Sequence, residues 1–364
     1  MSCRIARSLC VILLFALMVG CAPVKQKPIT ITLPPMTVVP PTATAQPTPT
    51  QPKVDAFAMN QKLGRGINLG NALEAPKEGD WGVRIKDDYF QIIRDAGFNS
   101  VRIPVRWSNH TLKKMPNVID KNFFARVDEV VEQALDRDLT VILNIHHYEE
   151  IMKEPAEQRD RFLFFWKQIA EHYRNYPDNL YFELLNEPNG DLKAKEWNEL
   201  INAVIPVIRE SSPDRILIIG PGEWYNISQL SNLSLPENDR AIIVSFHYYE
   251  PFNFTHQGAE WTPGMDAYLG TTWSGSEQEL KRLSDDFANA AKWAQRNNRP
   301  LYLGEFGAYS KADMDSQARY TAAVVSEAEK QGISWAYWEF CSGFGAYDLS
   351  HRKWYEPLLK ALIH

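Results

Sequence analysis

The chain has few cysteines, no excess of positive charge and a single short apolar run near its start. Four of its 364 residues are cysteine, and three of these precede residue 22, so no disulfide framework is available to the rest of the chain. The net charge of −6 argues against a nucleic acid partner, because phosphate binding needs a basic surface. The apolar run, residues 11–19, is too short to cross a bilayer as a helix, which takes about 20 residues.

Acidic residues are missing from the first 54 positions. Residues 1–52 hold nine of the 23 prolines, and their only charges are Arg4, Arg7, Lys25 and Lys27. All 45 acidic residues and all 11 tryptophans follow this segment. The composition therefore divides the chain into a basic leader and an acidic, tryptophan-rich body of globular character.

The leader begins with the pattern of an export signal. In residues 1–21, two arginines precede the apolar run, which is typical of a secretory signal peptide. The run ends at Gly20, and a small residue before Cys21 predicts lipoprotein processing with Cys21 as the lipidated N-terminus. Met18 stands where leucine is usual in such a signal, and cleavage after Ala22 by ordinary signal peptidase is the alternative.

Residues 22–54 predict a linker rather than a domain. The segment is rich in proline and threonine, so it cannot bury enough apolar surface to fold and favours polyproline II. We therefore expect a secreted or cell-surface protein, lipid-anchored to a bacterial membrane, with one folded domain over residues 55–364. We expect that domain to act as a monomer.

The period of the apolar pattern switches regularly through the body. Short β-rich runs alternate with amphipathic helical stretches, and runs without polar alternation belong to a sheet covered on both faces. Eight such units predict a (β/α)8 TIM barrel. A doubly wound sheet is the alternative, but no glycine-rich phosphate loop follows any run. The runs are residues 66–69, 100–105, 140–145, 181–185, 215–219, 241–246, 301–303 and 333–337.

Helical patterns lie between most of these runs. They bury one face at helical spacing, as helices packed around a barrel do. The segment 227–233 is only weakly helical. The clear patterns cover residues 83–96, 121–137, 158–173, 194–210, 277–296 and 313–330, and residues 355–363 close the chain.

Polar or aromatic residues follow nearly every strand run, where the active sites of barrel enzymes lie. Each could be structural alone, but together on one rim they indicate a site. Glu187 and Glu305 stand out, because two carboxylates across a cleft are what glycoside hydrolysis needs. A buried ion pair with Arg102 or with a lysine on the rim is the structural alternative for either glutamate. The sequence cannot give the separation that distinguishes retention from inversion.

The histidines do not form a metal-binding pattern. His146 and His147 are neighbours and would point to opposite sides of a strand. His247 could join one of them, but no HExxH-like helix pair is present. We therefore expect neither a metal nor a cofactor.

Aromatic residues suit a sugar-binding cleft, because their rings stack on the apolar faces of pyranoses. Trp261 and Trp338 follow strand runs and are the better candidates for stacking. Trp166, Trp197 and Trp293 lie within helical patterns, where packing explains them.

Seven motifs in order carry a family resemblance over residues 55–364. The chain resembles glycoside hydrolase family 5, and within it the bacterial endo-β-1,4-glucanases of subfamily 25. The motifs are GRGINLGNALEAPKEGDWG (64–82), VRIPVRW (101–107), NIHHYEE (144–150), LLNEP (184–188), HYYEPFNFTHQGAEW (247–261), GEFGAYSKAD (304–313) and WAYWEFCSGFG (335–345).

The resemblance implies roles for individual residues. Glu187 corresponds to the acid/base and Glu305 to the nucleophile. Asn186 would bind the sugar 2-hydroxyl, and Arg102 would hold Glu305. The remaining substrate-site residues implied in this way are Asn71, Glu74, His146, His147, His247, Tyr249, His256, Trp261 and Trp338.

The resemblance also implies a retaining endo-acting enzyme that cleaves internal β-1,4 bonds of cellulose, mixed-linkage glucan or glucomannan through a glycosyl-enzyme. A β-mannanase or xyloglucanase on the same scaffold is one alternative. A surface lipoprotein that binds polysaccharide without cutting it is another, and retention of both glutamates argues against it.

Overall fold

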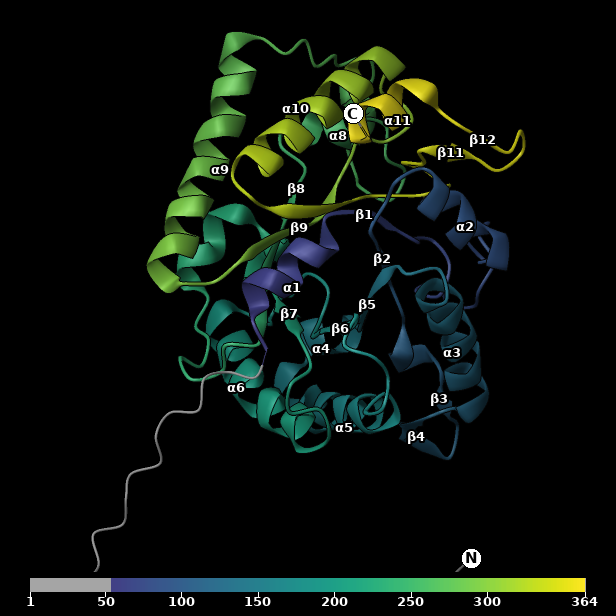
Figure 1. Cartoon of the computed structure of the whole chain (residues 1–364), viewed down its shortest axis with the longest axis vertical. Helices are drawn as coiled ribbons and strands as arrows, with labels where there is room; N and C mark the ends of the chain where they lie inside the picture. The colour runs from purple at the N-terminus through teal and green to yellow at the C-terminus, as the bar shows by residue number, and fades with distance from the viewer. Residues whose placement is uncertain (1–53, 364) are drawn as a thin grey trace, which may run out of the picture. The chain divides into compact units, whose positions relative to one another are not determined.

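The computed structural model describes residues 54–363. The predicted signal peptide, Cys21 and nearly all of the predicted linker lie outside the described residues. Eight strands form the centre of the described part (Figure 1). They are β1 (Arg65–Asn68), β2 (Ser100–Ile103), β5 (Thr140–Asn144), β6 (Leu180–Glu183), β7 (Leu217–Ile219), β8 (Ile242–Tyr248), β9 (Leu301–Phe306) and β10 (Ser334–Tyr337).

The strands close into a parallel barrel in the order β1-β10-β9-β8-β7-β6-β5-β2. Every neighbouring pair is parallel, and each strand overlaps one of the predicted runs. The predicted (β/α)8 barrel is confirmed, and the doubly wound alternative is wrong because β1 and β10 pair and leave no sheet edge.

Helices cover the outside of the barrel, and local signals fix where several begin. Asp120 caps α3 by accepting from the Asn122 amide at 2.8 Å, and Ser276 with Glu279 forms a capping box at α9. The helices between strands are α2 (Asp87–Asp95), α3 (Lys121–Leu135), α4 (Glu149–Lys153), α5 (Pro155–His172), α6 (Ala194–Ser211), α7 (Gly222–Tyr225), α8 (Phe252–Thr255), α9 (Glu277–Asn297) and α10 (Met314–Lys330), and α11 (Glu356–Leu362) follows β10.

The weakly helical segment after β7 is a 3-10 helix, Ile227–Asn232, so this barrel connection is short. Further 3-10 turns cover Trp107–Asn109 and Met265–Tyr268. The loops after β2 and β10 each contain a small two-stranded hairpin. They are β3 (Thr111–Leu112) with β4 (Met115–Ile119), and β11 (Tyr347–Asp348) with β12 (Lys353–Trp354).

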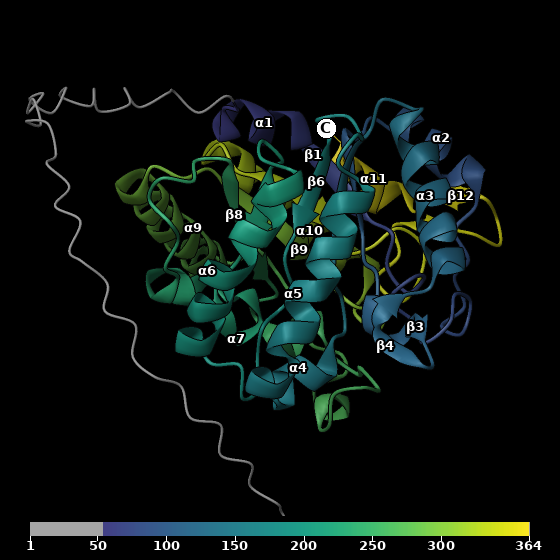
Figure 2. The same ribbon diagram turned by 90° about the horizontal axis from the view of Figure 1, so that it is seen from below.

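Helix α1 (Ala56–Leu63) packs at the amino end of the barrel, opposite α4 and α7 (Figure 2). Its Met59 and Leu63 join the apolar interior layer, and its backbone accepts hydrogen bonds from Tyr181 and Ser334 at 2.9 and 2.6 Å. Asn60 donates in turn to the Leu301 carbonyl at 2.9 Å. This helix therefore closes the end of the barrel that carries no active site.

The barrel interior changes from apolar to polar toward its carboxyl end. Asn68, Asn144 and Glu183 end three strands, Arg102 is the next-to-last residue of β2, and all four side chains are fully buried. Asn68 is the register partner of Arg102, and Asn144 is that of Glu183. Buried polar groups of this kind need partners, so this layer is where the strands support a site.

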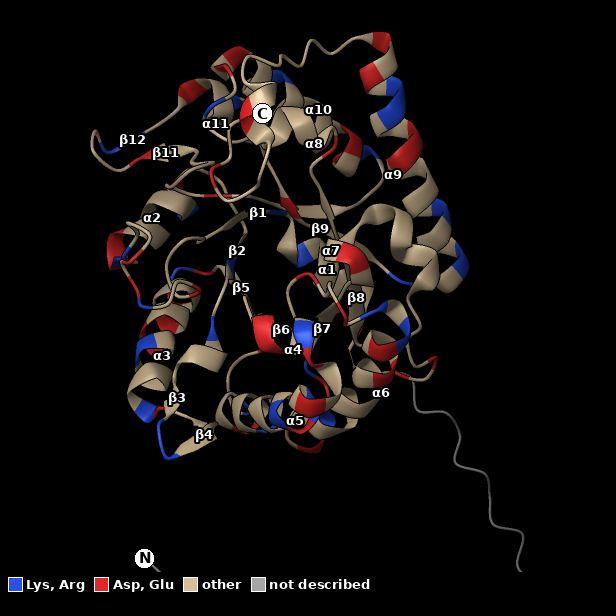
Figure 3. Cartoon of the chain, turned by 180° about the vertical axis from the view of Figure 1, so that it is seen from behind, with Lys and Arg blue, Asp and Glu red and all other residues tan. Residues whose placement is uncertain are grey.

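Charged residues of both signs are interspersed on the outer helices, as on α9 (Figure 3). Within residues 54–363, no helix is both long enough and apolar enough to span a membrane.

Candidate active site

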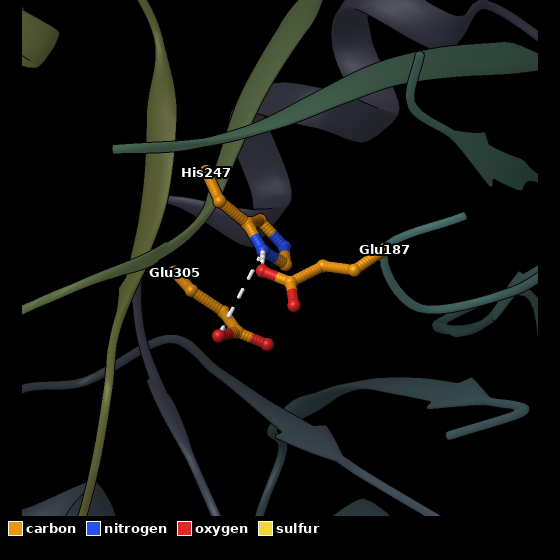
Figure 4. A group of neighbouring side chains, drawn as sticks. All are labelled: Glu187, His247 and Glu305. Atoms are coloured by element: carbon orange, nitrogen blue, oxygen red, sulfur yellow. Dashed lines mark hydrogen bonds and ion pairs between the residues drawn. The ribbon is translucent and has the colours of Figure 1, made fainter. Parts of the chain in front are cut away.

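Two glutamates and one histidine converge at the carboxyl end of the barrel. Glu305 lies in β9, His247 in β8, and Glu187 in the loop after β6. The backbone of Glu187 has a φ of +46°, a left-handed conformation that few non-glycine residues adopt. The three side chains point toward one another (Figure 4), and one nitrogen or oxygen of each lies within 4.8 Å of those of the others. One oxygen of Glu187 and one of Glu305 are therefore no more than 4.8 Å apart, which fits the close carboxyl pair of retaining glycosidases (~5–5.5 Å) better than the wider pair of inverting ones (~6.5–9.5 Å).

Arg102 lies beneath these side chains and donates hydrogen bonds to four neighbouring residues. Its Nη1 donates to Oε1 of Glu305 at 2.6 Å and to Oδ1 of Asn68 at 2.9 Å. Its Nη2 donates to Oδ1 of Asn186 at 2.7 Å, and its Nε donates to Oε2 of Glu183 at 2.6 Å. The guanidinium is fully buried, so it orients the carboxylate and the amide from below rather than contacting a ligand.

Glu305 is held by donors at both oxygens. Arg102 contacts Oε1, and the Tyr249 hydroxyl donates to Oε2 at 3.0 Å. Burial raises the pKa of Glu305, while the charge of Arg102 opposes that rise. The Tyr249 hydroxyl and the Arg102 cation both donate to Glu305, so they favour its ionised form and fix its orientation. Arg102 therefore does form an ion pair with one of the two glutamates, and that glutamate is Glu305.

Glu187 has a different environment. Its Oε1 lies 2.6 Å from Nδ1 of His247, and it makes no ion pair with Arg102. Burial raises the pKa of Glu187 to about 7, opposed by the charge of Arg102 and supported by that of Glu183. Burial also lowers the pKa of His247 to about 4, so its imidazole is neutral near pH 7. The two carboxyl groups thus differ as an acid and a nucleophile must.

His146, His147 and Trp338 line the side of the site next to β5 and β10. The His146 and Trp338 rings are parallel with centroids 5.9 Å apart, and the His147 ring meets His146 edge-on at 4.6 Å. Burial lowers the pKa of both histidines, so both are neutral hydrogen-bonding groups at neutral pH. Exposed Trp81 extends this row, edge-on to His147 at 5.5 Å.

The structure gives Glu74 a different setting from the other predicted hydroxyl binders. Its side chain is buried, and its two carboxylate oxygens accept the backbone amides of Asn71 and of Ala72, the latter at 3.0 Å. Burial raises the pKa of Glu74 to about 8. The residue therefore fixes the turn that presents Asn71, which has a φ of +61°.

Aromatic residues surround the loop after β8. His256 packs edge-on against Tyr249 at 4.9 Å, and Trp261 packs against Tyr309 at 4.8 Å. Trp261 is 58% exposed, which leaves one surface open for stacking. The tryptophans expected in packing, Trp166, Trp197 and Trp293, are buried as predicted.

Sequence reasoning missed Glu183, and it placed Trp224 and Glu339 after strand runs without assigning either a role. Glu183 was hidden inside a strand run, although a charge within an apolar run could have marked it. Glu339, which accepts the amides of Cys341, Ser342 and Phe344 at 2.9, 2.7 and 3.2 Å, fixes the loop after β10. Trp224 is 52% exposed in a loop whose Glu223, Trp224 and Tyr225 all have positive φ, and no sequence signal marks such a turn.

Glu187, His247 and Glu305 could also be considered as a metal site. However, Nδ1 of His247 contacts Glu187, and Arg102 already supplies a cation to Glu305. A zinc hydrolase site would need a further ligand in place of Arg102. The donor set therefore fits paired carboxylate chemistry better than metal binding.

Known proteins match most of this chain in sequence. The model for cellulase, glycosyl hydrolase family 5, matches residues 60–343. The chain is 38% identical over 297 residues to Endoglucanase H of Acetivibrio thermocellus, covering 81% of this chain and 32% of that protein. It is 30% identical over 329 residues to Endoglucanase B of Ruminococcus albus, covering 82% and 77%. The chain is also 31% identical over 340 residues to the Cellulase/esterase CelE of A. thermocellus, and the match covers 85% of this chain and 40% of that protein. The chain thus spans about a third of the length of Endoglucanase H and 40% of the length of CelE.

Solved structures extend the likeness to the fold. Cel5A of Thermotoga maritima in complex with cellobiose superposes with a TM-score of 0.83 at 53% identity, covering 85% of this chain and 100% of that chain. The same protein in complex with mannotriose gives the same TM-score, identity and coverage.

Proposed function

This chain belongs to the cellulase family, glycosyl hydrolase family 5, and from that membership we propose that it is a retaining endo-β-1,4-glucanase. The observation that carries the proposal is the placement of Glu187 and Glu305 at the carboxyl end of the barrel, with an oxygen of each within 4.8 Å. The substrates are β-glucans such as cellulose, mixed-linkage glucan and glucomannan, and the reaction needs no cofactor.

In the first step, an oxygen of ionised Glu305 attacks the anomeric carbon. The glycosidic C–O bond breaks as protonated Glu187 gives its proton to the leaving oxygen. The product is a glycosyl ester of Glu305 and a free sugar hydroxyl. Asn186 supports this step, because its Oδ1 is fixed by Arg102 and its Nδ2 remains the donor for the sugar 2-hydroxyl.

In the second step, Glu187 acts as a base. It takes a proton from a water molecule, whose oxygen attacks the anomeric carbon and releases the Glu305 carboxylate. Two inversions at the same carbon restore the starting configuration. The neutral imidazole of His247, 2.6 Å from Glu187, shares the proton that Glu187 gives up and regains.

The remaining predicted residues bind the polysaccharide. Asn71, His146 and His147 bind hydroxyls on the glycone side, and Trp338 stacks there with the nonpolar face of a sugar. His256 and Trp261, in the loop after β8, contact the chain further along. Glu74 acts on this side through the turn that carries Asn71.

The Glu305→Ala variant tests the nucleophile. We expect kcat on barley β-glucan or carboxymethyl-cellulose to fall by about a thousandfold or more, because the covalent route is lost, while circular dichroism stays that of the wild type. Activity within tenfold of the wild type would reject the assignment. A proton NMR time course on cellopentaose should show the β-anomer first, and α-anomer first would reject retention.

A mannan substrate is a second candidate, favoured by the 53% identity to the T. maritima protein that was solved with both cellobiose and mannotriose. Hydrolysis rates on soluble β-glucan, glucomannan, galactomannan and xyloglucan would separate the candidates. Activity on galactomannan equal to that on β-glucan would assign a dual glucanase and mannanase.

We also propose that the chain is exported by residues 1–21 and lipidated at Cys21, with residues 22–54 as a tether to a monomeric catalytic domain. The pattern of arginines, apolar run and Gly20-Cys21 supports this. The Cys21→Ser variant should move from the membrane fraction to the soluble fraction of a bacterial host. A variant that stays membrane-bound would contradict lipidation.

A further inference from the structure

Arg102 lies between two buried carboxylates, and only one of them belongs to the reacting pair. Its Nη1 contacts Glu305 at 2.6 Å, whereas its Nε contacts Oε2 of Glu183 at the same distance on the opposite side. The side chains of Arg102 and Glu183 are both 0% exposed. Glu183 ends β6, below the loop that carries Glu187.

Glu183 also reaches the glycone side of the cleft. The same Oε2 accepts from Nδ2 of Asn144 at 2.9 Å, and that Nδ2 lies 3.1 Å from Nδ1 of His146. Asn144 is fixed in turn, because its Oδ1 accepts the Val105 amide at 3.2 Å. One carboxylate in β6 therefore orients a guanidinium from β2 and an amide from β5.

The negative charge of Glu183 is only partly compensated. Both of its hydrogen bonds fall on Oε2, and within residues 54–363 its buried Oε1 has no hydrogen-bond partner. A buried charge acts over longer distances than an exposed one, because the interior screens it weakly.

Several charged and titratable groups surround Glu187. The charged and titratable groups that face it are Arg102 from β2, Glu183 from β6, His247 from β8, Glu305 from β9, and Tyr225 and Tyr249 from the loops after β7 and β8. Burial raises the pKa of Glu187, Arg102 lowers it, and Glu183 opposes the effect of Arg102.

We propose that Glu183 is a positioning residue that fixes Arg102 and Asn144 and, through its buried charge in contact with Arg102, limits the effect of that cation on Glu187. This inference rests on the proposed retaining glucanase function. The charge matters again after the first step, when Glu305 is a neutral ester. Arg102 would then stabilise ionised Glu187 and weaken it as a base, and Glu183 offsets that cation.

The pH dependence of kcat/KM on barley β-glucan separates charge from packing. The Glu183→Gln variant keeps the shape and an oxygen for Arg102 but removes the charge. We expect its alkaline limb to move to lower pH by about one unit, because loss of a nearby anion lowers the pKa of an acid. The Glu183→Asp variant keeps the charge but shortens the reach to Arg102, so we expect its limb to stay in place while kcat falls about tenfold.

Asp239→Asn is the matched control. Asp239 is a half-buried carboxylate that accepts from Arg209 at 2.8 and 3.1 Å, and it lies just before β8 at the amino end of the barrel. Its loss should lower the melting temperature without moving either limb.

The outcomes are distinct. An alkaline limb in Glu183→Gln that stays at the wild-type pH, or moves upward, overturns the inference, and so does a downward shift of equal size in Asp239→Asn. If Glu183→Gln does not fold, a displaced limb in Glu183→Asp overturns the inference, and an unmoved limb with reduced kcat supports it. A wild-type protein without glucanase or mannanase activity would instead refute the proposed function.

Discussion

The Nδ1 atom of His247 lies 2.6 Å from Oε1 of Glu187, so a buried neutral imidazole and a partly exposed carboxyl group face each other across one proton. The same imidazole lies 3.7 Å from Oε2 of Glu305. His247 therefore stands between the two carboxyl groups, and the protonation of Glu187 should govern the alkaline side of activity.

The first prediction concerns pH. Burial raises the pKa of Glu187 from the usual 4.5 to about 7. The acid form needed for the first step is thus present below about pH 7 and is lost as the pH rises through that value. We expect the kcat/KM profile on β-glucan to fall with an apparent pKa near 7 on its alkaline side.

Glu187→Gln provides the control for this prediction. It should lower kcat by about 10² to 10⁴ and remove the alkaline limb, because the titrating acid is gone. An alkaline limb that persists unchanged in the residual activity would assign that limb to another group.

The second prediction concerns Gly304, which precedes Glu305. A Cβ at this position would lie 2.8 Å from Oγ of Ser245 and 2.9 Å from Nε2 of His247. Gly304→Ala should therefore displace the imidazole from Glu187 and lower kcat about tenfold or more.

The matched substitution for Gly304 is Gly222→Ala, whose added Cβ would meet its nearest neighbour, Ala194, at 3.7 Å, an ordinary contact. Steady-state kinetics of both variants on β-glucan provide the measurement. Equal kcat values for Gly304→Ala and the wild type would show that the imidazole tolerates the displacement.

The barrel was predictable because its signals are local and repeated. Each strand is a short apolar run between longer amphipathic stretches, and eight repeats leave few other topologies. Helix α1 was not predicted, because its eight residues, AFAMNQKL, are too few to show a clear helical period. Its helical state depends on packing against strands distant in sequence, through contacts such as that of Asn60 with Leu301.

The site was predictable where residue type and strand end coincide. Glu187, Glu305 and His247 follow or end strand runs, and the structure brings them together. Glu183 lies within a strand run and was missed, and Trp224 follows a strand run but could not be assigned a role in the same way. The importance of Glu183 comes from its contact with a guanidinium 81 positions away, and that of Trp224 comes from a backbone turn.

The third prediction concerns stability at the opposite end of the barrel. Buried Arg215 donates to the carbonyls of Tyr173, Tyr176, Pro177 and Leu180 at 3.1, 2.8, 2.5 and 2.8 Å. Arg215→Met would leave these carbonyls without their donor, so we expect the free energy of unfolding to fall by about 3 kcal/mol in urea titrations.

Activity at 25 °C should survive in Arg215→Met, since the change is remote from Glu187 and Glu305. Arg159→Met is the comparison, because its ion pair with Asp160 is 3.0 Å long but exposed and should contribute about 0–1 kcal/mol. Equal losses in the two variants would contradict the assigned role of Arg215.

The fourth prediction concerns Trp224, which lies beside the acid. The backbone amide of Trp224 donates to the carbonyl of Pro188 at 3.1 Å, and Pro188 is the residue that follows Glu187 in the chain. Three consecutive residues with φ of 53°, 59° and 55° hold the ring in an exposed position. Such a conformation costs free energy, and it persists where the surrounding structure fixes it. Here buried Tyr225 anchors the turn, packing edge-on against His247 at 5.0 Å.

An exposed ring next to the acid is placed to stack with the sugar that leaves. We expect Trp224→Ala to raise KM on β-glucan about tenfold, equivalent to about 1.4 kcal/mol of lost binding. The KM for an aryl β-cellobioside, whose leaving group is not a sugar, should change by less than about twofold. Trp224→Tyr keeps a stacking ring and should restore most of the affinity for β-glucan. An equal rise of KM on both substrates would instead indicate that the substitution disturbs Glu187 through the shared loop.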